Sequence, residues 1–61
     1  MQQQKPKVLV VDDEKNILNT IGICLESIGI DVTLCAKPQE VLHLLQENVF
    51  DIALLSLYIF L

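Results

Sequence analysis

The chain has 61 residues, of which 52% are hydrophobic and 20% are charged, and its formal net charge is -4. This length allows one domain at most, and so small a domain buries only about 60% of the surface that its unfolded chain exposes. The high apolar content and the small net charge exclude an intrinsically disordered chain. Four basic residues against eight acidic ones argue against a nucleic-acid or anionic-membrane surface, and they favour a cation site or a basic partner.

The polar start of the chain lacks the apolar stretch of a signal peptide, so we expect a flexible N-terminus over residues 1–6 and one domain over residues 7–61. No apolar run reaches the roughly 18 residues that a membrane span needs. Cys24 and Cys35 are too few for a disulfide scaffold, and we expect both to be reduced thiols packed in the core. These features together predict a cytoplasmic protein.

The first predicted element is a strand over Lys7–Val11, because its unbroken apolar run is typical of a strand covered on both faces. After the acidic residues 12–14 the pattern becomes helical, and Gly29 occupies the position where a helix favours a left-handed residue. The apolar stripe of this helix consists of Ile17, Leu18, Ile21, Leu25 and Ile28.

A second strand is predicted over residues 30–35, and a second helix begins at Pro38, where the missing N–H of proline costs nothing. Asn48 is its expected end. The apolar run Ile52–Leu55 predicts a third buried strand. This alternation of strands and helices indicates an α/β fold, β-α-β-α-β, with a parallel three-stranded sheet and right-handed crossovers.

In parallel sheets the functional groups gather at the carboxyl ends of the strands, which here carry residues 12–14 and 56–58. Three adjacent carboxylates repel one another. Either the positive end of the following helix relieves them, with Asp13 as N-cap, or a Mg²⁺ ion does. The spacing alone leaves both alternatives open.

Other chemistries are excluded by composition. With only Gly22 and Gly29, the chain contains neither a P-loop nor a dinucleotide-binding glycine motif. A phosphatase with a nucleophilic aspartate would need Asp at the position of Glu14. His43 has no Cys or His partner at ligand spacing, and we expect it at the surface. No nucleophile–base pair is present, so we expect no enzyme activity.

Two blocks of the sequence, KVLVVDDE at residues 7–14 and FDIALLSL at residues 50–57, resemble the first half of a response-regulator receiver domain of the CheY-like, flavodoxin-like family. The resemblance covers nearly the whole chain. It implies the strand order 2-1-3 and a Mg²⁺ ion held by Asp12, Asp13 and the backbone carbonyl of Tyr58. It also implies two-component signal transduction by phosphorelay, with a sensor histidine kinase as phosphoryl donor.

The sequence departs from this family at the phosphoacceptor position, where Ser56 replaces the expected Asp. Ile59 and Phe60 stand where the family usually has a Met-Pro pair, and the family's later Ser/Thr and Lys lie beyond the 61 residues. A serine without an adjacent base is a weak nucleophile, so we expect no receiver phosphorylation and weak or absent Mg²⁺ binding. The alternative is a degenerate, non-catalytic interaction module.

A truncated receiver of this kind would expose the apolar edge of its third strand, and we expect it to form a homodimer there.

Overall fold

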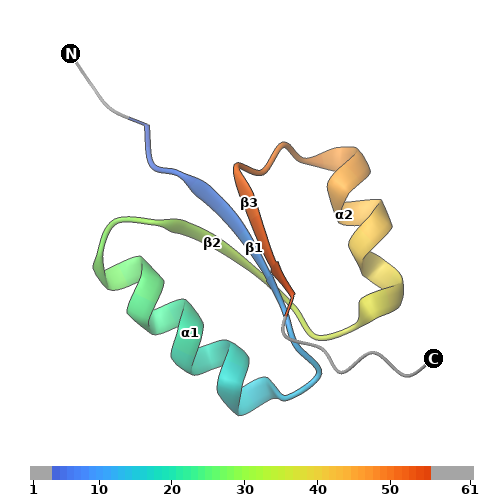
Figure 1. The fold of residues 1–61 in the computed structure, drawn as a ribbon, viewed down its shortest axis with the longest axis horizontal. Coiled ribbons are helices and arrows are strands. Elements are labelled where there is room, and N and C mark those ends of the chain that lie inside the picture. Colours follow the sequence, from blue (N-terminus) through green and yellow to red (C-terminus); the bar gives the residue numbers. More distant parts are fainter. Residues whose placement is uncertain (1–3, 56–61) are drawn as a thin grey trace.

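The computed structural model describes residues 4–55 and has one three-stranded sheet between two helices (Figure 1). Helix α1 lies on one side of the sheet and α2 on the other. The elements are β1 (Lys7–Val11), α1 (Lys15–Ser27), β2 (Asp31–Cys35), a 3₁₀ turn (Pro38–Glu40) that leads into α2 (Val41–Glu47), and β3 (Ile52–Leu55). Within the described range, no helix is long and apolar enough to cross a membrane.

The strand order is β2-β1-β3, and both pairings are parallel, which confirms the predicted fold class. The registers place Val10 between Leu34 of β2 and Leu54 of β3. Because β1 is the central strand and has a helix over each face, Val8, Leu9, Val10 and Val11 are all buried. The unbroken apolar run of β1 therefore has the environment that its sequence predicts.

The alternation of side chains along β1 divides the core into two clusters. On the α1 face, Val8 and Val10 pack with Leu18. On the α2 face, Leu9 and Val11 pack with Cys35, and the partly buried Val41, Leu44 and Phe50 lie against them.

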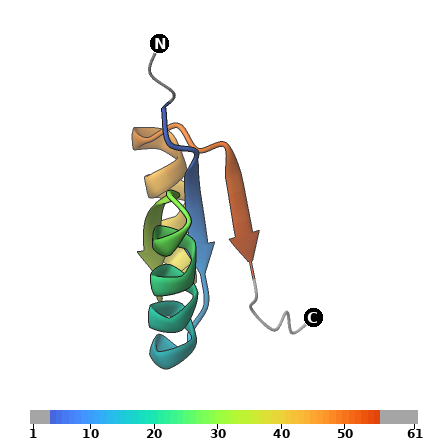
Figure 2. The same cartoon turned by 90° about the vertical axis from the view of Figure 1, so that its left-hand side faces the viewer.

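The expectation of a buried third strand is wrong, because all four residues of β3 are exposed. Figure 2 shows the reason: β3 stands on the side of β1 that is away from both helices. Helix α1 contacts β1 and β2 instead. An apolar run therefore identified the strand correctly, but it did not identify how the strand is covered.

Helix α1 buries a narrower stripe than the sequence predicts. Leu18 is buried, whereas Ile17 and Ile28 are 46% and 71% exposed. Cys24 is exposed as well, so the expectation of a core thiol is wrong for Cys24 and confirmed for Cys35. Cys24 follows Leu18 by six residues, which places it about 120° away around the helix axis.

The ends of the helices follow the sequence more closely. Gly29 has a φ of 86°, the left-handed conformation predicted for the residue after α1. Asn48 is the C-cap of α2, and its side chain donates to the carbonyl of Leu44 at 3.0 Å. Pro38 begins a 3₁₀ turn rather than an α-helix; the preceding Lys37 offers no side-chain acceptor to cap an α-helical turn.

Candidate functional site at the carboxyl end of β1

Asp12 directly follows β1 and is 4% exposed, which makes it the one buried charged residue among residues 4–55. Its backbone N–H donates to the carbonyl of Cys35 at 3.1 Å and so extends the β1–β2 ladder by one residue. The strand pairing therefore fixes the position from which the Asp12 carboxylate projects. Since all three strands are parallel, this position is at the carboxyl edge of the sheet.

The Asp12 carboxylate also shapes the turn into α1. Its Oδ1 accepts a hydrogen bond of 2.8 Å from the backbone N–H of Glu14. This bond leaves the carboxylate just before the N-terminus of α1, whose dipole stabilises negative charge. The local fold thus supplies a buried carboxylate with a fixed backbone and a favourable electrostatic environment.

The N-cap of α1 is Glu14, and the expectation that Asp13 has this role is wrong. Oε1 of Glu14 accepts from the backbone N–H of Asn16 at 3.1 Å. Asp is the commoner capping residue, so propensity alone favoured Asp13. Here the bond between Asp12 and the Glu14 N–H moves the helix start one residue further along the chain.

Helix capping therefore explains one of the three acidic residues, Glu14, and Asp12 accepts the turn bond through its Oδ1. The carboxylate of Asp13 is exposed at the same edge. No group of three or more His, Cys, Asp or Glu side chains is arranged to bind a metal within residues 4–55. A pair of carboxylates completed by water is nevertheless a donor set that suits Mg²⁺.

The other two predicted site residues, Ser56 and Tyr58, lie outside the described residues. The structure describes β3 up to Leu55, which is the register partner of Val11. In the sequence, Asp12 directly follows Val11 and Ser56 directly follows Leu55, and Val11 and Leu55 are paired in the sheet. The placement of Asp12 and Ser56 relative to each other stays a prediction.

His43 lies at the surface, as predicted: its side chain is 68% exposed, and its Nε2 is 3.5 Å from a carboxylate oxygen of Glu47. Sequence reasoning missed one polar contact at the opposite edge of the sheet. There Oδ2 of Asp51 accepts from the backbone N–H of Lys7 at 2.7 Å. An aspartate that precedes a strand is too common a feature to have indicated this bond.

Transcriptional regulatory proteins of Pseudomonas species are similar to this chain. It is 38% identical over 55 residues to the alginate biosynthesis transcriptional regulatory protein AlgB of Pseudomonas aeruginosa PAO1, and 39% identical over 56 residues to AlgB of Pseudomonas putida KT2440. These alignments cover 90% and 92% of the chain but only 12% of each relative. No protein-family model matches the chain. No solved structure matches it significantly. The chain is therefore a distant homologue of a short region of these regulators.

Proposed function

We propose that the chain corresponds to the first half of a response-regulator receiver domain and acts in signal transduction. The observation that carries this proposal is the buried Asp12 beside the exposed Asp13, at the carboxyl end of the central strand of a parallel 2-1-3 sheet. Homology to the AlgB proteins supports it, because these relatives are transcriptional regulatory proteins.

In this proposal Asp12 and Asp13 hold a Mg²⁺ ion, and the backbone carbonyl of Tyr58 completes the protein ligands. Bound there, the ion would neutralise the charge of a phosphoryl group. The turn bond from the Glu14 N–H keeps the Asp12 carboxylate in place, and α1 offsets part of its charge. The carboxylates of Asp12 and of the exposed Asp13 are the groups assigned to the ion and its waters.

Ser56 takes the phosphoacceptor position in this proposal, and a sensor histidine kinase is the phosphoryl donor. A neutral hydroxyl replaces a carboxylate there, which removes both an ionised nucleophile and one unit of negative charge. The chain therefore binds Mg²⁺ weakly and is not phosphorylated as receivers are. It is a regulatory module and not an enzyme.

The second candidate is a non-catalytic interaction module, and the exposure of β3 favours it. Ile52, Leu54 and Leu55 are 54%, 43% and 63% exposed, which is unusual for large aliphatic residues of a strand. A homodimer joined at the outer edge of β3 would cover them.

Intact-mass measurement after incubation with acetyl phosphate and Mg²⁺ tests the first candidate. We expect no stable adduct on the wild-type chain, and an adduct at Ser56 that beryllofluoride suppresses would overturn this expectation. Ser56→Asp should tighten Mg²⁺ binding about tenfold because it adds a carboxylate, whereas the matched Ser56→Ala should not. Equal Mg²⁺ affinity in both variants would remove Ser56 from the site.

A further inference from the structure

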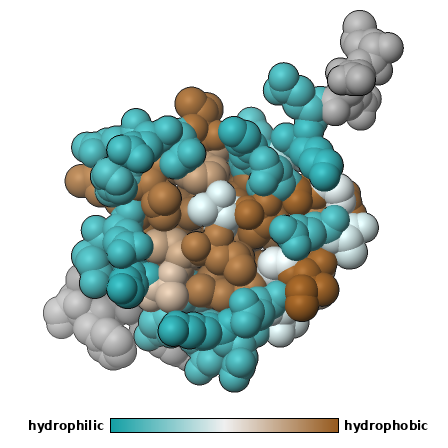
Figure 3. All heavy atoms as spheres, turned by 180° about the vertical axis from the view of Figure 1, so that it is seen from behind, coloured by the Kyte–Doolittle hydropathy of each residue, from teal (hydrophilic) through white to brown (hydrophobic). Residues whose placement is uncertain are grey.

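The edge of β2 presents an apolar surface that neither candidate function uses. Strand β2 borders the sheet on the side opposite β3. Figure 3 shows the molecule from this side, with apolar side chains gathered in the middle of the face and polar ones around them. Ile23 of α1 and Leu34 of β2, both near this edge, are 69% and 39% exposed. This edge lies on the far side of β1 from the point where the described chain ends.

The hydrogen-bond pattern identifies the free backbone groups of this edge. The backbone N–H of Asp31 donates to the carbonyl of Pro6, and the carbonyl of Cys35 accepts from the backbone N–H of Asp12. The backbone N–H and carbonyl groups of the odd-numbered residues of β2 therefore point toward β1. In a parallel ladder, alternate residues direct both backbone groups to the same side. The N–H and carbonyl groups of Val32 and Leu34 therefore point away from β1, toward the open edge.

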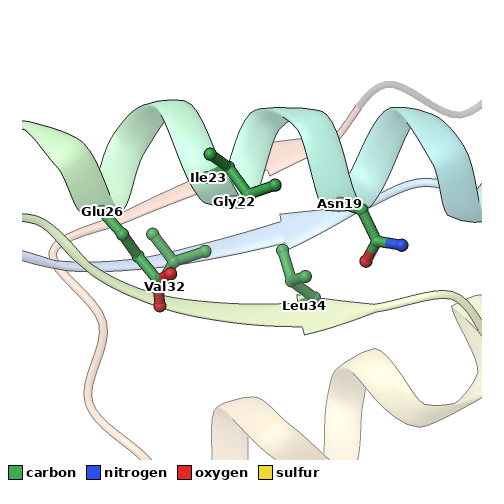
Figure 4. Close-up of a pocket in the computed structure, with 6 residues that line it drawn as sticks. All are labelled: Asn19, Gly22, Ile23, Glu26, Val32 and Leu34. Carbon is green, nitrogen blue, oxygen red and sulfur yellow. The ribbon is translucent and has the colours of Figure 1, made fainter.

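The side chains of the same two residues line a hollow between β2 and α1 (Figure 4). Its volume is about 310 Å³, and Gly22 forms the part of its wall nearest Leu34. A Cβ on Gly22 would come within 3.2 Å of Leu34 Cδ1, so the end of the Leu34 side chain packs directly against the glycine. Free backbone groups and apolar side chains thus occur together at one edge.

Within residues 32–34, the strand itself has no feature that protects its edge against pairing with another strand. Natural edge strands usually carry a charge, a proline or a bulge. Residues 32–34 are Val-Thr-Leu, and their register with β1 is regular. On the strand itself, charges occur only at the two ends, with Asp31 at the start and Lys37 after it; both are exposed, and neither forms an ion pair within residues 4–55. Glu26 of α1 also lies along this edge, beside Val32 in the lining of the hollow (Figure 4).

We propose that a second copy of this chain docks antiparallel along the β2 edge, with Thr33 opposite Thr33 of the partner. A two-fold axis at this position sets Val32 opposite Leu34 of the partner, and Leu34 opposite Val32 of the partner. In each pair, the backbone groups that point away from β1 form hydrogen bonds between the two β2 strands. On the α1 face, Val32 and Leu34 from both copies form one apolar cluster between the two α1 helices. Thr33 pairs with itself on the α2 face, a favourable cross-strand combination.

Charge complementarity selects a second copy as the occupant. In this register Asp31 lies opposite Cys35 of the partner and diagonal to Lys37 of the partner. A diagonal neighbour on the same face is within reach of a long side chain such as lysine. The two-fold axis forms this acidic–basic contact twice, so each copy supplies the charges that the other requires. The proposal does not depend on the receiver assignment.

Disulfide trapping tests the register. Thr33→Cys in a Cys24→Ser background should form a covalent dimer on mild oxidation, because a directly opposed pair of this kind has a Cα separation suited to a disulfide. Ala53→Cys, on β3, is the matched control in the same background and should stay largely uncrosslinked at equal concentration. Equal crosslinking of both variants, or none at position 33, would overturn the proposal.

Charge reversal tests the contact without relying on a disulfide. Asp31→Lys and Lys37→Asp should each weaken self-association about tenfold in sedimentation velocity, and the double variant should restore it. Leu34→Lys should abolish dimerisation at the β2 edge, while Ala53→Lys, which disturbs the β3 edge, should leave it intact. Loss of dimerisation in Ala53→Lys but not in Leu34→Lys would assign self-association to β3 and overturn the proposal. Amide NMR spectra check that each variant is folded. A monomeric wild-type chain at millimolar concentration, or a double variant without recovery, would contradict the proposal.

Discussion

Asp51 holds the backbone of Lys7 with two hydrogen bonds at the amino ends of β1 and β3, one through its own backbone and one through its side chain. The N–H of Asp51 donates to the carbonyl of Lys7 at 2.8 Å, and the N–H of Lys7 donates to Oδ2 of Asp51 at 2.7 Å. The two residues are 44 positions apart in the sequence. This reciprocal pair fixes where β3 begins against β1, and thereby which residues reach the carboxyl edge.

Asp51→Ala should lower the free energy of unfolding by about 1 kcal/mol, since it removes a hydrogen bond to a charged acceptor at an exposed site. Asp51→Asn keeps a side-chain oxygen for the Lys7 N–H and should cost less. Urea denaturation followed by circular dichroism measures both. Equal losses in the two variants would show that the side-chain bond contributes little and that the charge matters instead.

The two glycines should respond to alanine in opposite directions. Gly22→Ala should stabilise the chain by up to about 1 kcal/mol, because alanine favours the helix and the half-exposed Leu34 can move by the few tenths of an ångström required. Gly29→Ala should destabilise it by about 1 kcal/mol, because alanine is strained at a φ of 86°. Thermal melts of the two variants provide the comparison, and a destabilised Gly22→Ala would mean that Leu34 is held rigidly.

Glu14→Ala should cost about 0.5 kcal/mol of stability, because the Asn16 N–H loses its capping acceptor. Asp13→Ala should have a much smaller effect, since Glu14, and not Asp13, is the N-cap of α1. Urea midpoints of the two variants distinguish them directly. A larger loss for Asp13→Ala would restore Asp13 as the N-cap.

Cys24 should react with a thiol reagent in the folded chain, and Cys35 should react only after unfolding. The first is exposed on α1, whereas the second is buried, and its Sγ is 3.1 Å from the carbonyl oxygen of Lys37. Counting modified thiols by mass spectrometry before and after urea addition measures this. Two modified cysteines in the native chain would contradict the packing of Cys35 against Leu9 and Val11.

The sequence predicted the positions of the strands and helices better than it predicted which of their residues are buried. Apolar runs located β1 and β3 because burial of a strand requires them, and Gly29 marked the end of α1 because few other residues adopt its backbone conformation. The same runs could not show that neither α1 nor α2 covers β3. Which strands the helices cover depends on the path of the connections between the strands, and these connections place both helices over β1 and β2.

The candidate site was predictable in part, for a similar reason. The acidic residues and their place at a strand end follow from the order of elements. The separate roles of Asp12, Asp13 and Glu14 do not follow from the order of elements, because the bond from the Glu14 N–H to Asp12 forms only once the chain has made the turn. Capping propensity favours Asp over Glu, and that local geometry overrides it.

A Mg²⁺ titration followed by amide NMR most directly tests the claim that Asp12 and Asp13 form a weak receiver-type cation site. We expect saturable shifts of the Asp12, Asp13 and Glu14 amides with a dissociation constant of about a millimolar or weaker. Asp12→Asn retains an oxygen for the Glu14 N–H and should abolish these shifts, whereas the control Glu14→Gln should preserve them. Shifts that persist in Asp12→Asn, or no shifts in the wild type, would contradict the account.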